Sequence, residues 1–362
     1  MLPLYPVNRG HLDVLSDAIG VMQHANGSRP DPVHGYCTDD VARALQVDLL
    51  HQRVLGWPAV SESAWRNVRF LANALDHPTR RFRNFRGADG TWLDSAGSED
   101  SQGRAMLALA ETMAHAPDDR LAASAQRLFF EALPAALGLG ALRARSSVLL
   151  ACDVAQRAVA SRETTLAARV LAGRLRSTFG SRPSADWPWP EDRLTYENAL
   201  PARALLVAGR CLASRQTIEA GLNLVDWLID AQTAPAGHLS PIGNGWWTHG
   251  GSRSQFDQQP IEATALLLAA ETALELTDDS AYGVAMERAY GWFLGANDLG
   301  LAVAAPERGA GHDGLTPTGV NANQGAESTL MWLTALEHVR SHRAAPPAPP
   351  SPSPRVLAAA GR

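Results

Sequence analysis

The sequence contains no lysine: all 32 of its basic residues are arginine. This absence excludes a lysine Schiff base, a lysine-anchored pyridoxal cofactor and the lysine of a P-loop. Basic residues do not outnumber acidic ones either, since the formal net charge is −5. Without a basic surplus the chain lacks the attraction that drives binding to a phosphate backbone, so we expect no nucleic-acid partner.

Cysteine is also scarce. Cys37, Cys152 and Cys211 are far apart and form no CxxC pair. An odd number of widely spaced cysteines favours neither a disulfide framework nor a cysteine zinc site. The histidines form no HExxH or other closely spaced ligand pair. We therefore expect no metal and no cofactor.

Long apolar runs are missing as well. No run reaches the ~18 residues typical of a membrane span, which predicts no membrane partner. The sequence does not open with a basic stretch followed by an apolar core, the pattern of a signal peptide. We expect a cytoplasmic protein.

Strand patterns are rare, and Ala- and Leu-rich helical segments of two kinds dominate. Amphipathic segments, typical of helices that cover a core, alternate six times with segments that are apolar all round, typical of buried helices. The amphipathic segments are 12–22, 63–75, 118–133, 164–175, 217–229 and 281–293. The buried segments are 41–50, 105–113, 148–159, 202–212, 263–274 and 329–336. This repeat of helical hairpins predicts an all-α (α/α)6 barrel, a closed toroid; an open superhelix of helix pairs is the alternative.

The predicted barrel fills residues 1–341 as one catalytic domain. Residues 342–362 are so rich in proline that they cannot hold a helix or build a core, which predicts a disordered tail. Connections from an amphipathic to a buried helix are long, except around 138–144. Long connections in a compact domain are usually functional, and here they gather at one end of the barrel. We expect the site at that end.

A polar cluster closes each long connection, where a buried helix begins. The clusters read HGYCTDDVARAL (34–45), GSEDSQGRAMLAL (97–109), WPWPEDRLTYENALPARALL (187–206), FDQQPIEATALL (256–267) and GHDGLTPTGVNANQGAEST (311–329). Acidic residues also cap helices and suit the helix dipole, and for any single carboxylate this role is an equal alternative. Capping does not require tandem acids beside tryptophans and glycines in five clusters, so the set indicates a site.

The loop tryptophans point to carbohydrate, because sugar rings stack on indole faces while amides and guanidinium groups bind hydroxyls. A lone loop tryptophan can also fill a gap in the barrel rim. The substrate-binding candidates are His34, Tyr36, Asp39, Arg104, Trp187, Trp189, Asp192, Asn244, Trp246, Trp247, Gln258, His312 and Gln324.

With GYCTDD, GSEDSQGRA, FDQQPIEA and VNANQGAEST at its helix starts, the chain resembles the six-hairpin glycosidase superfamily over about residues 5–340. More closely, it is similar to a bacterial family found beside or fused to glycosyltransferases. The superfamily contains inverting hydrolases, phosphorylases, lyases and epimerases, and the epimerases use a histidine acid–base pair. The resemblance therefore implies an oligosaccharide substrate and a glycosyltransferase encoded nearby as a possible partner.

Our leading hypothesis is hydrolysis of a glycosidic bond by two carboxylates with inversion. The acid is expected to be Glu99 or Asp100, and the base Asp257 or, second, Asp313. Asp40 modulates the acid or binds the reacting sugar. Alternatives on the same fold are glycosyl transfer to phosphate, epimerisation, and a non-catalytic sugar-binding partner of a glycosyltransferase.

Overall fold

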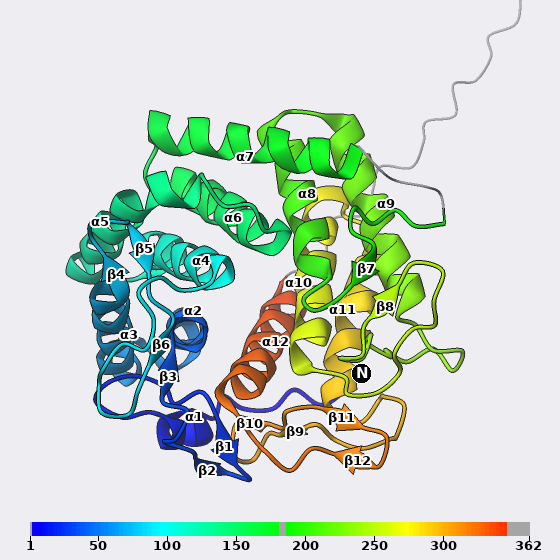
Figure 1. The fold of residues 1–362 in the computed structure, drawn as a ribbon. Helices are drawn as coiled ribbons and strands as arrows, with labels where there is room; N and C mark the ends of the chain where they lie inside the picture. The colour runs from blue at the N-terminus through cyan, green and yellow to red at the C-terminus, as the bar shows by residue number, and fades with distance from the viewer. Residues whose placement is uncertain (1, 181–185, 346–362) are drawn as a thin grey trace, which may run out of the picture.

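The computed structural model describes residues 2–180 and 186–345, and these contain twelve α-helices (Figure 1). The helices are α1 (Gly10–Leu15), α2 (Thr38–Leu55), α3 (Ser61–Ala74), α4 (Glu99–His115), α5 (Asp119–Ala136), α6 (Leu142–Ala158), α7 (Arg162–Gly180), α8 (Ala199–Cys211), α9 (Arg215–Ala231), α10 (Pro260–Thr277), α11 (Ser280–Phe293) and α12 (Ala326–Ala344). A short 3-10 helix, η1 (Trp57–Ala59), precedes α3.

The even-numbered helices form a closed inner ring. Each of α2, α4, α6, α8, α10 and α12 contacts the next, and α12 contacts α2. The odd-numbered helices α3, α5, α7, α9 and α11 lie outside this ring (Figure 1). The closed ring confirms the predicted (α/α)6 toroid and rules out the open superhelix.

Burial follows the two kinds of segment that the sequence distinguishes. Helix α10 buries residues all round its circumference, including the unbroken run from Pro260 to Leu267. Outer helix α9 buries only one stripe, Thr217, Gly221, Leu224, Val225 and Leu228. The difference places α10 between neighbours on all sides and α9 at the surface.

The first predicted outer helix, 12–22, is wrong in extent. Helix α1 ends at Leu15, and Ser16 pairs with Val21 as an isolated bridge. The Asp17 carboxylate accepts hydrogen bonds from the amides of Ile19 (2.8 Å) and Gly20 (3.2 Å). An aspartate side chain that binds nearby backbone amides competes with helix formation, which explains the early end.

Within residues 2–180 and 186–345, the long connections carry twelve two-residue strands, paired antiparallel. They are β1 (Ala25–Asn26) with β2 (Arg29–Pro30), β3 (Tyr36–Cys37) with β6 (Phe85–Arg86), β4 (Leu75–Asp76) with β5 (Arg81–Phe82), β7 (Arg193–Leu194) with β8 (Trp247–Thr248), β9 (Ala304–Ala305) with β10 (Ala310–Gly311), and β11 (Leu315–Thr316) with β12 (Gly319–Val320). Two of these pairs, β3–β6 and β7–β8, join different connections. We call the end of the ring where the six inner helices begin the long-loop end, and the opposite end the short-loop end.

Both termini of the described chain meet at the last hairpin. The Arg343 guanidinium donates to the carbonyl of Leu2 (2.9 Å) and the Tyr290 hydroxyl to that of Pro3 (3.0 Å). Helix α12 reaches Ala344, three residues beyond the predicted domain boundary. The rest of the predicted tail, 346–362, lies outside the described residues. Among the helices that the structure describes, none is long and apolar enough to cross a membrane.

Candidate functional site

Two arginines stand about one turn inside the long-loop end, and each bridges two carboxylates. Arg43 of α2 contacts Asp40 and, on α12, Glu327, both at 2.8 Å. Arg104 of α4 contacts Asp39 of α2 at 2.8 Å and Glu197, just before α8, at 2.5 Å. We call this set the ion-pair layer: Asp39, Asp40, Arg43, Arg104, Glu197 and Glu327.

The two aspartates of the layer differ in their electrostatics. Burial opposes the charge of Asp39, yet Arg104 and Arg43 outweigh it and lower the pKa of this carboxyl. Burial dominates at Asp40, which is 4% exposed, and raises its pKa although Arg43 is close. The Cys37 thiol also donates to Asp40. Asp40 is therefore a buried support of the site, whereas Asp39 holds Arg104 in place through an ion pair.

Asp100, in the first turn of α4, accepts a hydrogen bond from the hydroxyl of Tyr196. Tyr196 and Glu197 lie in the turn before α8, so one turn reaches both Asp100 and Arg104. The Arg143 guanidinium stacks over the Tyr196 ring at 4.5 Å and donates to the Tyr196 carbonyl. The site is thus assembled across α4, α6 and the start of α8.

A buried network holds this turn, which we call the 195–198 turn. The side-chain oxygen of Asn198 accepts from the Thr195 amide and from Arg143, both at 3.0 Å. The Asn198 amide group donates to Glu262 of α10 at 3.1 Å. Burial raises the pKa of Glu262 to about 7, against the lowering effect of the Asn198 hydrogen bonds.

Strained backbone conformations also occur at the long-loop end. Glu197 (φ 48°), Trp246 (φ 66°) and Asp257 (φ 59°) have left-handed conformations without being glycine, and all three lie in long connections. Glutamate and tryptophan are not among the residues that tolerate this region well. Strain of this kind persists where the surroundings impose it and is frequent at functional sites.

Two predicted catalytic carboxylates instead support helix starts. Glu99 accepts hydrogen bonds from the amides of Gly140 (2.8 Å) and Ala141 (2.5 Å), at the start of α6. Helix α6 has no side-chain cap of its own, so Glu99 satisfies its free N–H groups from α4. Asp313 accepts from the Gly325 amide (2.8 Å) before α12 in the same way. For these two residues the structure favours the capping alternative.

Most of the predicted tryptophan platforms are packed into the protein. Trp189 is 1% exposed and lies edge-on to Phe179; Trp187 is 5% exposed and stacks on His249. Trp247 stacks on Trp227. Protein side chains cover most of the Trp187 and Trp189 rings, and sugar stacking on these two residues stays a prediction. Trp246 is partly exposed, with the Arg193 guanidinium 4.6 Å from its ring centre.

Three further binding candidates are buried. Tyr36, 1% exposed, donates its hydroxyl to Asp17. Gln258, 0% exposed, accepts from the Trp292 indole and donates to Asp298. Gln324, 5% exposed, contacts His312. Hydrogen bonds within the protein occupy these side chains, and a substrate role for Tyr36, Gln258 and Gln324 stays a prediction.

The other candidates reach the surface of the long-loop end. His34, Asp192, Asn244 and Asp257 are exposed, and His312 is partly exposed. No hydrogen bond to the Asp257 carboxylate is found among the described residues. The described histidines of the long connections do not form a pair across the site: His34 packs on His24, His249 on Trp187, and His312 bonds to the Asn321 carbonyl.

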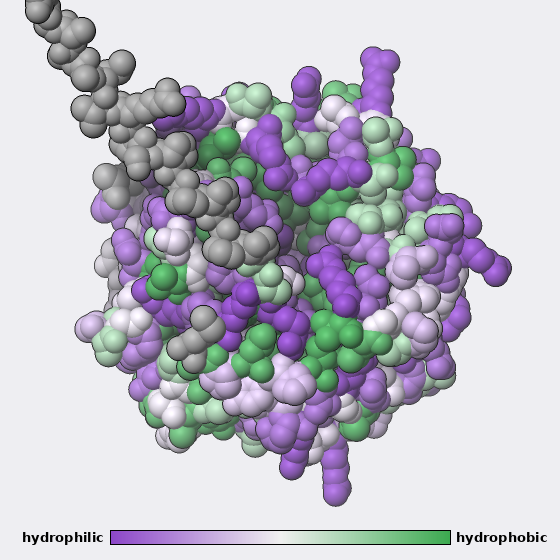
Figure 2. Space-filling model, turned by 180° about the vertical axis from the view of Figure 1, so that it is seen from behind, coloured by the Kyte–Doolittle hydropathy of each residue, from purple (hydrophilic) through white to green (hydrophobic). Residues whose placement is uncertain are grey.

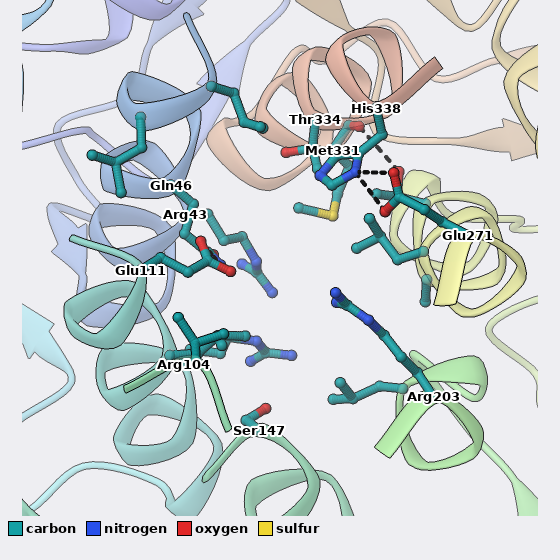
Figure 3. Close-up of a pocket in the computed structure, with 18 of the residues that line it drawn as sticks. Arg43, Gln46, Arg104, Glu111, Ser147, Arg203, Glu271, Met331, Thr334 and His338 are labelled. Carbon is teal, nitrogen blue, oxygen red and sulfur yellow. Dashed lines mark hydrogen bonds and ion pairs between the residues drawn. The ribbon is translucent and has the colours of Figure 1, made fainter. Parts of the chain in front are cut away.

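A cavity of about 470 Å³ lies on the axis of the ring (Figure 3). It begins at Arg43, Arg104 and Glu197 and extends to residues near the ends of the inner helices, such as His115 and Glu275. Of the predicted site residues, only Arg104 lines it. Asp100 and Asp257 do not line it, and the cavity extends from the ion-pair layer toward the far ends of the inner helices. Within 2–180 and 186–345, no group of three or more His, Cys, Asp or Glu residues is arranged to hold a metal ion.

Sequence reasoning missed Arg43, Tyr196, Glu197 and Arg143 as site residues. Tyr196 and Glu197 belong to the quoted cluster WPWPEDRLTYENALPARALL, and Arg43 to HGYCTDDVARAL. Arg43 follows Asp40 by three positions, a spacing that places both side chains on one helix face. That spacing was the available signal for Arg43. Arg143 lies in the repeat whose connection is short and carries no acidic cluster.

Solved structures with the same architecture act on sugars, according to their names. No protein-family model and no curated protein sequence matches the chain. Cellobiose 2-epimerase from Bacillus thermoamylovorans B4167 superposes with a TM-score of 0.70 and 13% identity, over 91% of this chain and 95% of the epimerase. A D-mannose isomerase gives 0.68 and 12%, over 92% and 94%. A GH76 α-mannanase from Bacteroides thetaiotaomicron gives 0.60 and 8%, over 85% and 87%.

These proteins share the (α/α)6 toroid of the six-hairpin glycosidase superfamily. The expected resemblance is therefore confirmed at the level of fold. The neighbours include epimerases, an isomerase and hydrolases, so the fold alone does not select a reaction.

Proposed function

We propose that the protein is a carbohydrate-active enzyme that hydrolyses a glycosidic bond at the long-loop end of the toroid. The observation that carries this proposal is the convergence of Asp100, Tyr196 and the ion-pair layer at the end of the toroid that also holds three strained residues of the long connections. The named activities of proteins with the same fold support a carbohydrate substrate. An oligosaccharide is the class of substrate that a cleft built from several loops can hold.

Asp100 and Asp257 are the proposed catalytic pair. Asp100 accepts a hydrogen bond from Tyr196 and lies near Arg104, so its carboxyl group is held in a fixed position inside the site. Asp100 therefore suits the base that activates water. Asp257 is exposed in a long connection at the same end, and no hydrogen bond to its carboxylate is found among the described residues, so it is the proposed acid. These roles reverse the ones that the sequence suggested.

In the proposed reaction Asp257 protonates the leaving oxygen while Asp100 removes a proton from water that attacks the anomeric carbon. The ion-pair layer fixes Arg104, whose charge would stabilise Asp100 throughout. A direct displacement of this kind inverts the anomeric configuration and places the two carboxyl groups ~6.5–9.5 Å apart.

The test uses a panel of manno-, cello-, xylo- and malto-oligosaccharides with product analysis by chromatography. Asp100→Asn and Asp257→Asn should each lower kcat by about 100-fold or more, the usual contribution of general acid–base catalysis. Asp119→Asn is the matched control, since Asp119 is an exposed first-turn acid on outer helix α5. Near-normal turnover by both site variants would exclude the pair.

Leaving-group dependence separates the two roles. An aryl glycoside with an acidic phenol needs no protonation of its leaving oxygen, so it should restore turnover in Asp257→Asn but not in Asp100→Asn. NMR of the first-formed anomer then reports inversion or retention. If the activated aryl glycoside instead restored turnover in Asp100→Asn, Asp100 would be the acid and Asp257 the base.

Epimerisation or isomerisation is the second candidate function, favoured by the cellobiose 2-epimerase and the D-mannose isomerase among the structural neighbours. It predicts that free disaccharides or mannose are converted without cleavage. A non-catalytic partner of a glycosyltransferase, the third alternative, predicts that oligosaccharides raise Tm while no product forms. The same panel distinguishes all three.

A further inference from the structure

The axial cavity is separate from the proposed catalytic carboxylates. Asp100 and Asp257 do not line it, and its walls continue past the ion-pair layer to Arg53, His115 and Arg157 near the ends of inner helices. On the face opposite that of Figure 1, hydrophilic side chains border a central recess (Figure 2). A ligand entering from the short-loop end would reach the ion-pair layer without crossing the long connections.

Three arginines direct their guanidinium groups into this cavity from different walls (Figure 3). Arg43 of α2 and Arg104 of α4 come from one side, and Arg203 of α8 from the other. Arg43 and Arg104 each already bridge two carboxylates of the ion-pair layer. A guanidinium carries five N–H donors, so both retain donors beyond those used in their ion pairs.

Arg203 differs from the other two because no carboxylate within 2–180 or 186–345 forms an ion pair with it. Its Nε donates to the Thr272 hydroxyl at 3.1 Å, which fixes the side chain. The two terminal nitrogens have no hydrogen-bond partner among these residues and point into the cavity (Figure 3). Arg203 is half-buried, so these nitrogens remain accessible to a ligand inside the cavity.

Two acidic residues of the cavity wall form hydrogen bonds or ion pairs with residues other than the three arginines. Glu111 accepts from Gln46 at 3.0 Å, and Glu271 binds His338 at 2.7 Å. Glu275 is exposed toward the short-loop end. Glu271 also interacts with the Arg203 charge through space, without forming an ion pair, so Arg203 faces one carboxylate that His338 already binds. The hydroxyl groups of Ser147 and Thr334 add neutral hydrogen-bond partners.

We propose that the axial cavity is a binding site for a small oxyanion, held by Arg203 together with Arg43 and Arg104. Bidentate contact with two oxygens of a phosphate or carboxylate group is the interaction that a free guanidinium makes best. The anion is either inorganic phosphate or the phosphate or carboxylate group of a single sugar derivative, both of which the cavity volume of about 470 Å³ accommodates.

Isothermal titration calorimetry of the full chain with inorganic phosphate, glucose 1-phosphate and glucuronate tests the proposal. We expect at least one probe to bind wild type with one site per chain. Arg203→Gln should weaken that binding by at least about 10-fold, the usual effect of losing a hydrogen bond to a charged group. Arg203→Lys keeps the positive charge but cannot form the bidentate contact, so this variant should bind the anion with intermediate affinity.

Arg215→Gln is the matched control, because Arg215 is 92% exposed on α9 and pairs with Glu219. It should bind as wild type does. Circular dichroism and Tm verify that each variant is folded. Tightest binding of phosphate identifies the free ion as the ligand, and tightest binding of either sugar probe identifies the derivative. No binding of any probe to wild type, or equal binding by folded Arg203→Gln, would overturn the proposal. Because turnover is not measured, the result is independent of the hydrolysis proposal.

Discussion

Glu262 is a buried carboxyl that holds the 195–198 turn through Asn198. It is 3% exposed, and its neighbours Asn198 and Arg143 belong to the support of the 195–198 turn. Burial raises the pKa of Glu262 from 4.5 to about 7. The folded protein therefore holds a proton at Glu262 in a pH range where the unfolded chain has already lost it.

This difference predicts the sign of a pH effect on stability. Below pH 4.5 the carboxyl is protonated in both states. As the pH rises to about 7, the unfolded chain loses this proton while the folded protein keeps it, so the free energy of unfolding decreases. The free energy of unfolding of wild type should fall relative to Glu262→Gln across this window, by roughly 3 kcal/mol at most. Urea denaturation of both proteins below 4.5 and above 7 measures it. A difference that stays constant with pH would show that Glu262 does not titrate in this range.

Individual residue roles were only partly predictable from the sequence. The tandem acids Asp39 and Asp40 lie at the predicted helix start, but their opposite pKa shifts depend on Arg104 and on burial. Glu99 and Asp100 are adjacent, yet one supports the start of α6 and the other faces Tyr196. Sequence spacing cannot separate such neighbours, because their partners come from other hairpins.

At the scale of elements, α4 and α6 pack closely where Gly103 faces α6. A Cβ at Gly103 would lie 2.9 Å from the Ala144 carbonyl oxygen and 3.0 Å from the Ser147 Cβ. Gly173, inside α7, has no atom within 4 Å of the corresponding position. The two glycines are therefore a matched pair that differs in packing alone.

Gly103→Ala should destabilise the protein by about 1–3 kcal/mol, because the added methyl group forces the helices apart. Gly173→Ala should instead stabilise it by about 0.5–1 kcal/mol, since alanine loses less backbone entropy in a helix. Chemical denaturation of the two variants provides the comparison. Equal effects of both substitutions would contradict the close packing of α4 against α6.

The helices were predictable because their hydrophobic patterns reflect burial directly. The uniformly apolar segments 202–212 and 263–274 correspond to α8 and α10, and the striped segment 118–133 to α5. The segment 12–22 failed because its apolar pattern carried no sign of the turn at Asp17. The two-residue strands were not predictable, since pairs such as β7–β8 depend on connections far apart in the sequence.

At the scale of the whole molecule, the toroid has two chemically different ends. The long-loop end gathers carboxylates, Tyr196 and strained backbone, whereas the axial cavity behind the ion-pair layer presents Arg203. The predicted fold required only the repeat of hairpins. The division between the two ends could not be predicted, because it depends on which way the arginines of facing helices point.

Hydrogen–deuterium exchange with the oligosaccharide that the substrate panel identifies tests the location of the site most directly. Asp257→Asn is used so that the sugar persists during the measurement. We predict slower exchange at the start of α4, in the 195–198 turn and in residues 244–259, with little change near the ends of the inner helices. Protection confined to the last turns of α10 and α12 would contradict a catalytic site at the long-loop end.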